Sequence, residues 1–248
     1  MKIKVASTGS TGNCYQLIAG DESILLDCGI SHHRIYKAFG GLKGIQGCLV
    51  THEHKDHSLA MADLALHGVD IYATAGTYGA LHMKPDQSSR YHTVCFKTQY
   101  QMGGFTVMPV PVMHDADEPC GFLIRHGLNG EVALYATDTY YLPNRYPGVH
   151  FWIIECNFIE ERADEMVREG TVSPFMKMRL IRSHMSLRRL KDTLMANDLT
   201  MARKIVLVHL SDSRSDEVRM VHEIADLTGI ETVAALGGME IPLDLAPF

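Results

Sequence analysis

Four side chains able to bind metal ions lie in one short stretch of the chain, at His52, His54, Asp56 and His57. In an extended segment, residues two apart point the same way, so His52 and His54 can bind one ion together. Asp56 and His57 fall where the chain bends into a predicted helix, so they can face a second point nearby. Imidazole and carboxylate groups suit Zn²⁺, Mn²⁺ or iron. A histidine-rich surface turn is the alternative, but the stretch ends a predicted strand, where α/β proteins form their sites.

Three further residues of ligand type follow apolar segments that we predict to be strands. His114 ends MPVPVMH, Asp138 ends ALYATD, and His209 ends KIVLVH. A single such residue at a strand end is more often a surface or capping group. Together with the first four, these residues supply enough ligands for two metal ions and one bridging carboxylate. Two ions about 3.5–4 Å apart can hold a bridging hydroxide and clamp a phosphodiester.

A β-rich start and a mixed later part surround these residues. The predicted strands are Lys2–Ser7, Cys14–Ala19, Ser23–Asp27, Gly47–Thr51, Ile71–Ala73, Thr93–Phe96, Phe105–Val110, Gly121–Arg125, Val132–Ala136, Phe151–Glu155, Lys204–His209 and Glu231–Ala235. The predicted helices are Ser31–Phe39, Ser58–His67, Glu160–Arg168, Leu187–Ala196 and Asp216–Leu227. These elements suit two packed sheets with helices outside. The chain of 248 residues shows no linker or repeat, so we expect one domain over residues 1–248.

The composition, 46% hydrophobic and 21% charged, is that of an ordinary globular protein. The net charge of −6 argues against a generally basic nucleic-acid-binding surface but allows a local basic patch. Six cysteines without a CxxC pair indicate reduced core thiols rather than a cysteine zinc site. The first residues, MKIKVASTGSTGN, lack a signal peptide's apolar stretch, and no long apolar run follows. We therefore expect a cytoplasmic protein with no membrane partner.

The segment from Phe175 to Lys191 is basic and contains no acid. Its basic residues are Lys177, Arg179, Arg182, Arg188, Arg189 and Lys191. Such groups bind phosphate backbones in a salt-dependent way, although a solvated helix face would have the same composition. We expect Arg182, Arg188 and Ser186 to bind substrate. His184 lies inside the segment, and we hypothesise that it contacts the scissile phosphate or protonates the leaving oxygen; a helix-start residue bound to backbone is the alternative.

Asp27 ends a predicted strand ahead of the histidine-rich stretch. We expect its carboxylate to orient a ligand histidine from behind, and a strand-end cap is the alternative. The Ser7–Asn13 loop can offer backbone amides to an anion, or it can be a plain hairpin turn.

The order of ligand types along the chain resembles that of the metallo-β-lactamase superfamily. HxHxDH at residues 52–57 is followed by a lone histidine, a lone aspartate and a final histidine, and the likeness runs from about Lys4 to Ala235. The resemblance implies an α/β fold, the four-layer αββα sandwich. It also implies that one metal ion is bound by His52, His54 and His114, the other by Asp56, His57 and His209, and both by a bridging Asp138.

Shorter segments resemble the YycJ/WalJ-like branch of that superfamily. These segments are Ser10–Cys14, Leu25–Ser31, Val112–Ala116, Ile154–Asn157 and Val208–Ser211. Phe158 departs from the pattern, because the branch usually has a histidine there, and SHMS around His184 replaces the more usual GHLS. The branch is linked to exonuclease activity on single-stranded DNA, so the resemblance implies nucleic acid as the substrate.

These observations predict a dinuclear metal-dependent phosphodiesterase, namely a DNA nuclease or exonuclease that uses a metal-bridging hydroxide. Asp56, Asp138 and His184 would take part in catalysis, with two divalent ions, Zn²⁺, Mn²⁺ or iron, as cofactors. Two alternatives stay open. The same ligands could serve an acyl hydrolase acting on a lactone, thioester or β-lactam, which predicts an apolar acyl pocket and little salt dependence of substrate binding. A non-catalytic module would instead bind DNA without metal-dependent turnover.

Overall fold

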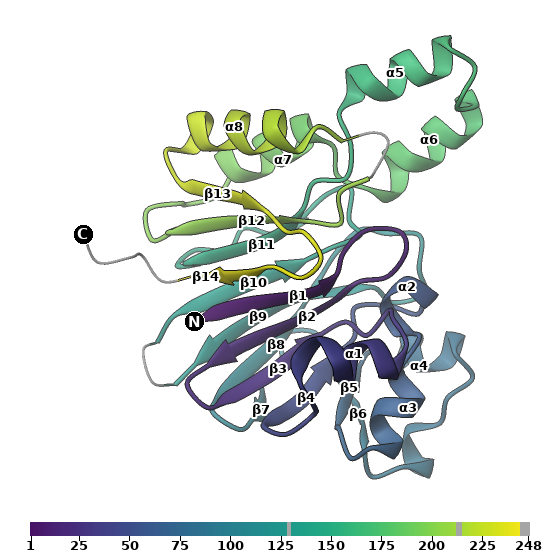
Figure 1. Ribbon diagram of the computed structural model, residues 1–248, viewed down its shortest axis with the longest axis vertical. Helices are drawn as coiled ribbons and strands as arrows, with labels where there is room; N and C mark the ends of the chain where they lie inside the picture. The colour runs from purple at the N-terminus through teal and green to yellow at the C-terminus, as the bar shows by residue number, and fades with distance from the viewer. Residues whose placement is uncertain (128–129, 212–214, 244–248) are drawn as a thin grey trace.

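The computed structural model describes residues 1–127, 130–211 and 215–243, and it has two sheets packed face to face with helices outside (Figure 1). The first sheet has the order β14 (Glu240–Pro242), β1 (Lys2–Ser7), β2 (Cys14–Ala19), β3 (Glu22–Leu26), β4 (Ile45–Leu49), β5 (Ile71–Ala73) and β6 (Tyr91–Thr93). The second has the order β13 (Glu231–Ala234), β12 (Lys204–Val208), β11 (Phe151–Glu155), β10 (Val132–Ala136), β9 (Cys120–His126), β8 (Phe105–Pro111) and β7 (Tyr100–Met102).

Helices cover the outer face of each sheet, which makes four layers. The first sheet carries α1 (His32–Phe39), α3 (Met61–Leu66) and α4 (Ala75–Ala80), and the second carries α7 (Leu187–Met195) and α8 (Glu217–Thr228). A hairpin of α5 (Glu160–Arg168) and α6 (Pro174–Ser183) projects from the sandwich near α7 (Figure 1). The short elements are α2 (Lys55–Ser58) and the 3-10 turn η1 (Pro85–Gln87). The αββα sandwich expected from the sequence is confirmed.

Apolar side chains fill the space between the sheets and the space under the helices. Strand β11 shows how: Phe151 and Ile153 belong to the core between the sheets, whereas Trp152 and Ile154 belong to the core under α7 and α8. Successive side chains of a strand point to opposite faces, and both faces of this strand are covered, so all of it is buried. The strands are thereby held rigidly, and so are the chain segments that leave their ends.

Strand direction brings the expected ligands to one edge of the sandwich. Strands β10, β11 and β12 are parallel, and so are β3 and β4. Strand β8 runs parallel to β10, because both are antiparallel to β9. The carboxyl ends of β8, β10 and β12 therefore lie at one edge, from which His114, Asp138 and His209 follow. The segment 52–57 follows β4 in the first sheet.

Three helical regions differ from the sequence prediction, and one of them is α6, a helix that the sequence analysis did not predict. The pattern predicts one helix over Ser58–His67, but the structure has α2 and α3 with a break between them, where the amide of Ala60 donates to the carbonyl of Cys28 at 2.9 Å. Helix α4 escapes prediction because AGTYGA contains two glycines and no helical apolar pattern. The short edge strands β7 and β14 were also not predicted.

The expectation of one domain over residues 1–248 stays a prediction, and residues 244–248 lie outside the described ranges. Within those ranges, no helix is long and apolar enough to cross a membrane.

Candidate metal centre

All seven residues predicted as metal ligands lie together at this edge of the sandwich. Their ligand atoms form two groups that share Asp138, and within each group the atoms lie within 4.8 Å of one another. One group contains His52, His54, His114 and Asp138, and the other contains Asp56, His57, His209 and Asp138. Each group therefore combines residues that follow strands of both sheets.

In the first group, three imidazoles surround one carboxylate oxygen. Nδ1 of His54 lies 3.1 Å from Nε2 of His52 and 3.2 Å from Nε2 of His114. Oδ2 of Asp138 lies 3.8 Å from Nε2 of His52 and 3.5 Å from Nε2 of His114.

The other oxygen of Asp138 faces the second group. Oδ1 lies 3.2 Å from Nε2 of His57 and 3.5 Å from Nε2 of His209. Oδ2 of Asp56 lies 3.5 Å and 3.6 Å from the same two nitrogens. Because its two oxygens face different groups, Asp138 has the geometry required of a bridging carboxylate.

The donor atoms fit two divalent transition-metal ions. Ligand atoms bound tetrahedrally at about 2.0–2.1 Å are about 3.3–3.4 Å apart, and the separations above run from 3.1 to 3.8 Å. Nε2 of His209 is buried and has no hydrogen-bond partner among the described residues. Such an atom is costly to leave without a partner, and a metal ion would provide one.

Asp27 contacts the ring nitrogen of His57 that does not face the other predicted ligands, as the sequence predicted. It is fully buried, and its Oδ2 lies 2.7 Å from Nδ1 of His57. Its Oδ1 accepts hydrogen bonds from the amide and hydroxyl of Thr51 at 2.8 and 3.0 Å, and the hydroxyl of Tyr135 donates to Oδ2 at 2.6 Å. Oγ1 of Thr51 also lies 3.0 Å from Nδ1 of His52. Contacts of this kind fix the tautomer and direction of a ligand imidazole.

Glu155 makes similar contacts to site residues contributed by the second half of the chain, His184 and His209. It was not among the predicted site residues. Its Oε1 lies 2.6 Å from Nδ1 of His184 and 3.1 Å from Nδ1 of His209. Its Oε2 accepts hydrogen bonds from the amides of Thr139 at 2.8 Å and Met185 at 3.1 Å. The available signal was an acid that ends the otherwise apolar strand FWIIE. A buried carboxylate requires such partners.

His184 lies beside the ligands, at the end of α6. Its ring stacks on that of His209, with centroids 5.3 Å apart and 13° between the planes. The preceding residue, Ser183, accepts a hydrogen bond through its carbonyl from Nδ1 of His114 at 2.8 Å. The end of α6 is thus attached to both groups of ligands.

Three site residues have left-handed backbone conformations. The φ angles are 57° at Asp27, 45° at Asp138 and 54° at His209. Each residue lies within two positions of a strand end, so the turn redirects the side chain toward the shared site. This conformation costs a non-glycine residue about 1–2 kcal/mol, and such strain is concentrated at functional sites.

Neighbouring charges divide the histidines into two kinds. Burial lowers the pKa of His52 and of His114, so both rings are neutral and keep a free lone pair. Burial also acts to lower the pKa of His209, but the carboxylates of Asp138, Asp56 and Glu155 outweigh it and raise the pKa to about 10. The pKa of His57 is likewise raised, because Asp138 and Asp27 outweigh its burial. In the metal-free protein, protons on these two rings balance the carboxylates.

A cavity of about 280 Å³ opens onto both groups of ligands. Its lining includes His54, Asp56 and Asp138 of the two groups together with Phe175 and Arg179 of α6. An adjoining cavity of about 540 Å³ is lined by His114 together with Met178 and Arg182. Helix α6 therefore forms one wall of the approach to the ligands.

Some cations of the basic segment 175–191 form ion pairs, and others line the cavities. Three of its cations form ion pairs away from the ligands, Lys177 with Asp164, Arg188 with Glu160 and Lys191 with Glu223. Arg179 and Arg182 line the cavities beside the ligands. Arg179 also lies 3.9 Å from Asp115, but both side chains are well exposed, so this pair is weak.

The predicted substrate-binding residues therefore have different surroundings. His184 and Arg182 line the cavities, but Ser186 and Arg188 do not. Ser186 is buried and caps α7: its hydroxyl accepts a hydrogen bond from the amide of Arg189 at 3.3 Å and donates to Glu160.

A four-layer αββα sandwich with two His/Asp groups sharing one carboxylate defines a class of metal-dependent hydrolases. The family model of the beta-lactamase superfamily domain matches residues 22–210, and the chain belongs to this superfamily. It is a hydrolase of the metallo-β-lactamase fold.

Two named relatives show which branch of the superfamily the chain resembles. Exodeoxyribonuclease WalJ of Streptococcus pneumoniae is 26% identical over 249 residues, which cover 94% of this chain and 88% of the relative. Exodeoxyribonuclease YycJ of Bacillus anthracis is 30% identical over 191 residues, which cover 73% and 70%. The resemblance to the YycJ/WalJ-like branch is confirmed. Among solved structures, the metallo-beta-lactamase fold protein YhfI from Bacillus subtilis shares the fold, with a TM-score of 0.72 and 17% identity over 96% of this chain and 98% of that one.

Proposed function

We propose that this protein is a dinuclear metal-dependent phosphodiesterase that acts as an exonuclease on single-stranded DNA. The observation that carries the proposal is the position of Arg179 and Arg182, which line the cavities that open onto the ligands. Arginine suits phosphate oxygens through its planar fork of donors. Two cations beside a dinuclear site match an anionic phosphodiester better than the uncharged acyl group of a lactone or β-lactam.

The seven ligands would divide between two ions as the distances group them. His52, His54 and His114 would hold one ion, Asp56, His57 and His209 the other, and Asp138 both. When bound, two divalent ions supply an activated water and neutralise charge on the phosphodiester. Nitrogen and oxygen ligands of this kind suit Zn²⁺ or Mn²⁺, with iron as the third candidate.

His184 would donate the proton that the leaving oxygen needs. Glu155 occupies Nδ1 of the ring, which leaves Nε2 as the nitrogen free to meet the substrate. Burial acts to lower the pKa of His184, but the charge of Glu155 and its hydrogen bond raise it overall, so the ring holds its proton to a higher pH than a free imidazole does. An imidazole with a raised pKa beside the cavity has the features of a general acid.

The names of the relatives support the choice of substrate. WalJ and YycJ are both named exodeoxyribonucleases, and the first aligns with almost the whole of this chain. A cytoplasmic location stays a prediction.

The decisive experiment uses two substrates, bis-p-nitrophenyl phosphate and a 5′-labelled single-stranded oligonucleotide. Wild type and Asp56→Ala are assayed with EDTA, Mn²⁺ or Zn²⁺. We expect cleavage that EDTA abolishes, that added metal restores and that Asp56→Ala lacks, with stepwise shortening of the oligonucleotide. No cleavage of either substrate by a protein that holds its metal ions would overturn the proposal in favour of an acyl hydrolase.

A further inference from the structure

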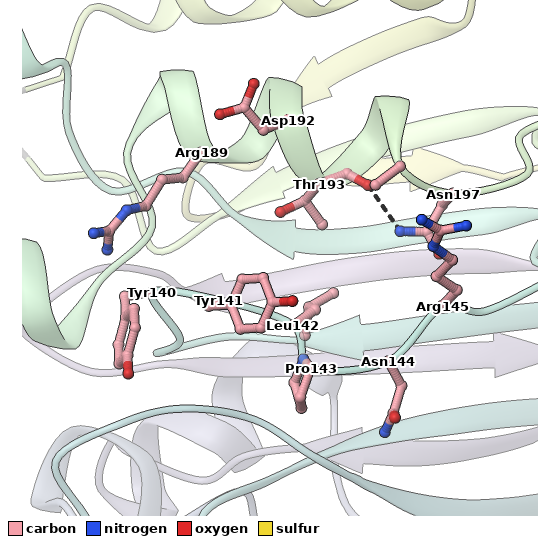
Figure 2. Close-up of a pocket in the computed structure, with 11 residues that line it drawn as sticks. Tyr140, Tyr141, Leu142, Pro143, Asn144, Arg145, Arg189, Asp192, Thr193 and Asn197 are labelled. Carbon is pink, nitrogen blue, oxygen red and sulfur yellow. Dashed lines mark hydrogen bonds between the residues drawn. The ribbon is translucent and has the colours of Figure 1, made fainter.

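A third cavity lies between two segments that follow residues of the metal centre in the chain, and it takes no part in the chemistry described above. It measures about 460 Å³ and lies between α7 and residues 140–145 (Figure 2). Both walls of the cavity follow residues of the site in the chain: residues 140–145 come after Asp138, and α7 comes after His184. A ligand in this cavity would therefore be a close neighbour of whatever occupies the metal centre.

Arginines lie at both ends of this cavity. Figure 2 shows Arg189 near Tyr140 at one end and Arg145 near Asn197 at the other. The guanidinium carbon of Arg189 is 5.3 Å from the centre of the Tyr140 ring, and one of its nitrogens donates to the carbonyl of Ile181 at 2.6 Å. Within the part of the chain that the structure describes, neither arginine has a carboxylate at ion-pair distance. Their charges are therefore available to an anion at each end.

The space between the arginines has an apolar side and a polar side. Tyr141 and Leu142 form the first, and Tyr141 is 54% exposed, so its ring is open to a ligand. Asp192 and Thr193 of α7 lie across the cavity from them (Figure 2). A tyrosine ring is a stacking surface for a nucleobase, and a carboxylate can accept a hydrogen bond from a base amino group.

We infer that this cavity binds one nucleotide of the DNA strand, next to the nucleotide at the metal centre. The base lies against Tyr141, and the phosphates on its two sides meet Arg189 and Arg145. A nucleotide within a strand has a phosphate on each side, which accounts for cations at both ends of a cavity of this size. A free inorganic anion would leave the tyrosine and leucine surface unused, and a neutral apolar ligand would leave both arginines without partners. The inference rests on the proposed function for its choice of a DNA strand.

The direct test is a titration of metal-free protein in EDTA with 2′-deoxyadenosine 3′,5′-bisphosphate, followed by amide NMR. This probe carries one base and both flanking phosphates, and it requires neither metal nor turnover. We expect saturable shifts at residues 140–145 and 189–197. Tyr141→Ala and Arg145→Ala should each weaken binding about tenfold. Tyr36→Ala and Arg34→Ala, on exposed positions of α1, are the matched controls and should bind as wild type does.

The second test is kinetic. Tyr141→Ala should raise KM for the oligonucleotide about tenfold and leave hydrolysis of bis-p-nitrophenyl phosphate unchanged, since that substrate is too small to reach the cavity. Equal affinity and equal KM in Tyr141→Ala and wild type, or shifts confined to the metal ligands, would overturn the inference. Wild type that binds the bisphosphate between α7 and residues 140–145 but cleaves no phosphodiester would instead support the nucleotide site and refute the proposed function.

Discussion

Oε1 of Glu155 lies 2.6 Å from Nδ1 of His184, and this contact joins the proposed general acid to the metal centre. The same oxygen lies 3.1 Å from Nδ1 of His209, a proposed metal ligand. One buried carboxylate therefore orients a ring that would bind a metal ion and a ring that would donate a proton. Removing the charge of Glu155 should therefore affect both metal binding and proton donation.

Glu155→Gln should lower kcat for the oligonucleotide by about 10²-fold or more, because His184 loses the partner that raises its pKa. The carboxylate raises the pKa of His184, so in the variant the ring loses its proton at a lower pH. The alkaline limb of the pH–rate profile should move to lower pH accordingly. Glu165→Gln, at the surface of α5, is the control. An unmoved alkaline limb would mean that His184 is not the acid.

His184→Ala should separate two kinds of phosphodiester. A DNA leaving group needs a proton, whereas p-nitrophenolate is stable as an anion. The variant should therefore lose about 10²-fold or more in oligonucleotide turnover and much less with bis-p-nitrophenyl phosphate. Metal content by mass spectrometry checks that the ligands are intact. Equal losses with both substrates would assign His184 to metal binding or structure instead.

Asp27→Asn should weaken the second metal group selectively, because Asp27 contacts Nδ1 of His57. Loss of such a partner typically costs about 10–100-fold in metal affinity. After dialysis, we expect less metal in the variant than in wild type, with the deficit confined to one of the two ions. Asp63→Asn, on an exposed position of α3, should retain as much metal as wild type. Full retention by Asp27→Asn would show that the contact does not tune binding.

Metal uptake should release protons and become tighter as the pH rises. The pKa of His209 is about 10 in the metal-free protein, so at neutral pH a metal ion must displace its proton. Titration calorimetry of Zn²⁺ binding in buffers of different ionisation enthalpy measures this release; heats that do not depend on the buffer would contradict it. Since the unfolded value is about 6.5, the same proton stabilises the metal-free fold below about pH 6.5, and that contribution is lost as the pH rises through about 10.

Arg179→Ala should reduce the salt dependence of DNA binding. Each phosphate contact with a single strand contributes about 0.7 to the slope of log affinity against log salt. The variant's slope should therefore be smaller by about 0.7, measured by fluorescence anisotropy with metal-free protein. Arg34→Ala, on α1, should leave the slope unchanged. An unaltered slope in Arg179→Ala would show that Arg179 of α6 does not contact a DNA phosphate.

The clustered His and Asp residues could be predicted from sequence because each is marked by a local feature. His52 and His54 share a spacing, and His114, Asp138 and His209 each follow an apolar run that had to be a strand. Glu155 also ends an apolar run, FWIIE, but its role depends on His184 and His209, which are 29 and 54 residues away along the chain. The parallel pairing of β11 with β12 brings Glu155 to His209, and the hydrogen bond between the amide of Met185 and Glu155 holds His184 beside them.

The substrate-binding prediction was limited for a related reason. Composition treats the basic residues of 175–191 alike, but α6 ends at Ser183 and α7 begins at Leu187. Arg182, on α6, lines a cavity beside His114, whereas on α7 Arg188 pairs with Glu160 and Arg189 lines the cavity between α7 and residues 140–145. The turn between the helices makes Ser186 a helix cap, a role that its position before a predicted helix already allowed.

Each group of ligands combines segments from both sheets, with His52, His54, Asp56 and His57 from the first and His114, Asp138 and His209 from the second. A bound ion in either group would consequently be a cross-link between the two halves of the sandwich. Loss of the metal ions would then lower the stability of the protein as well as its turnover. Without that cross-link, the protein would become easier to unfold and to degrade.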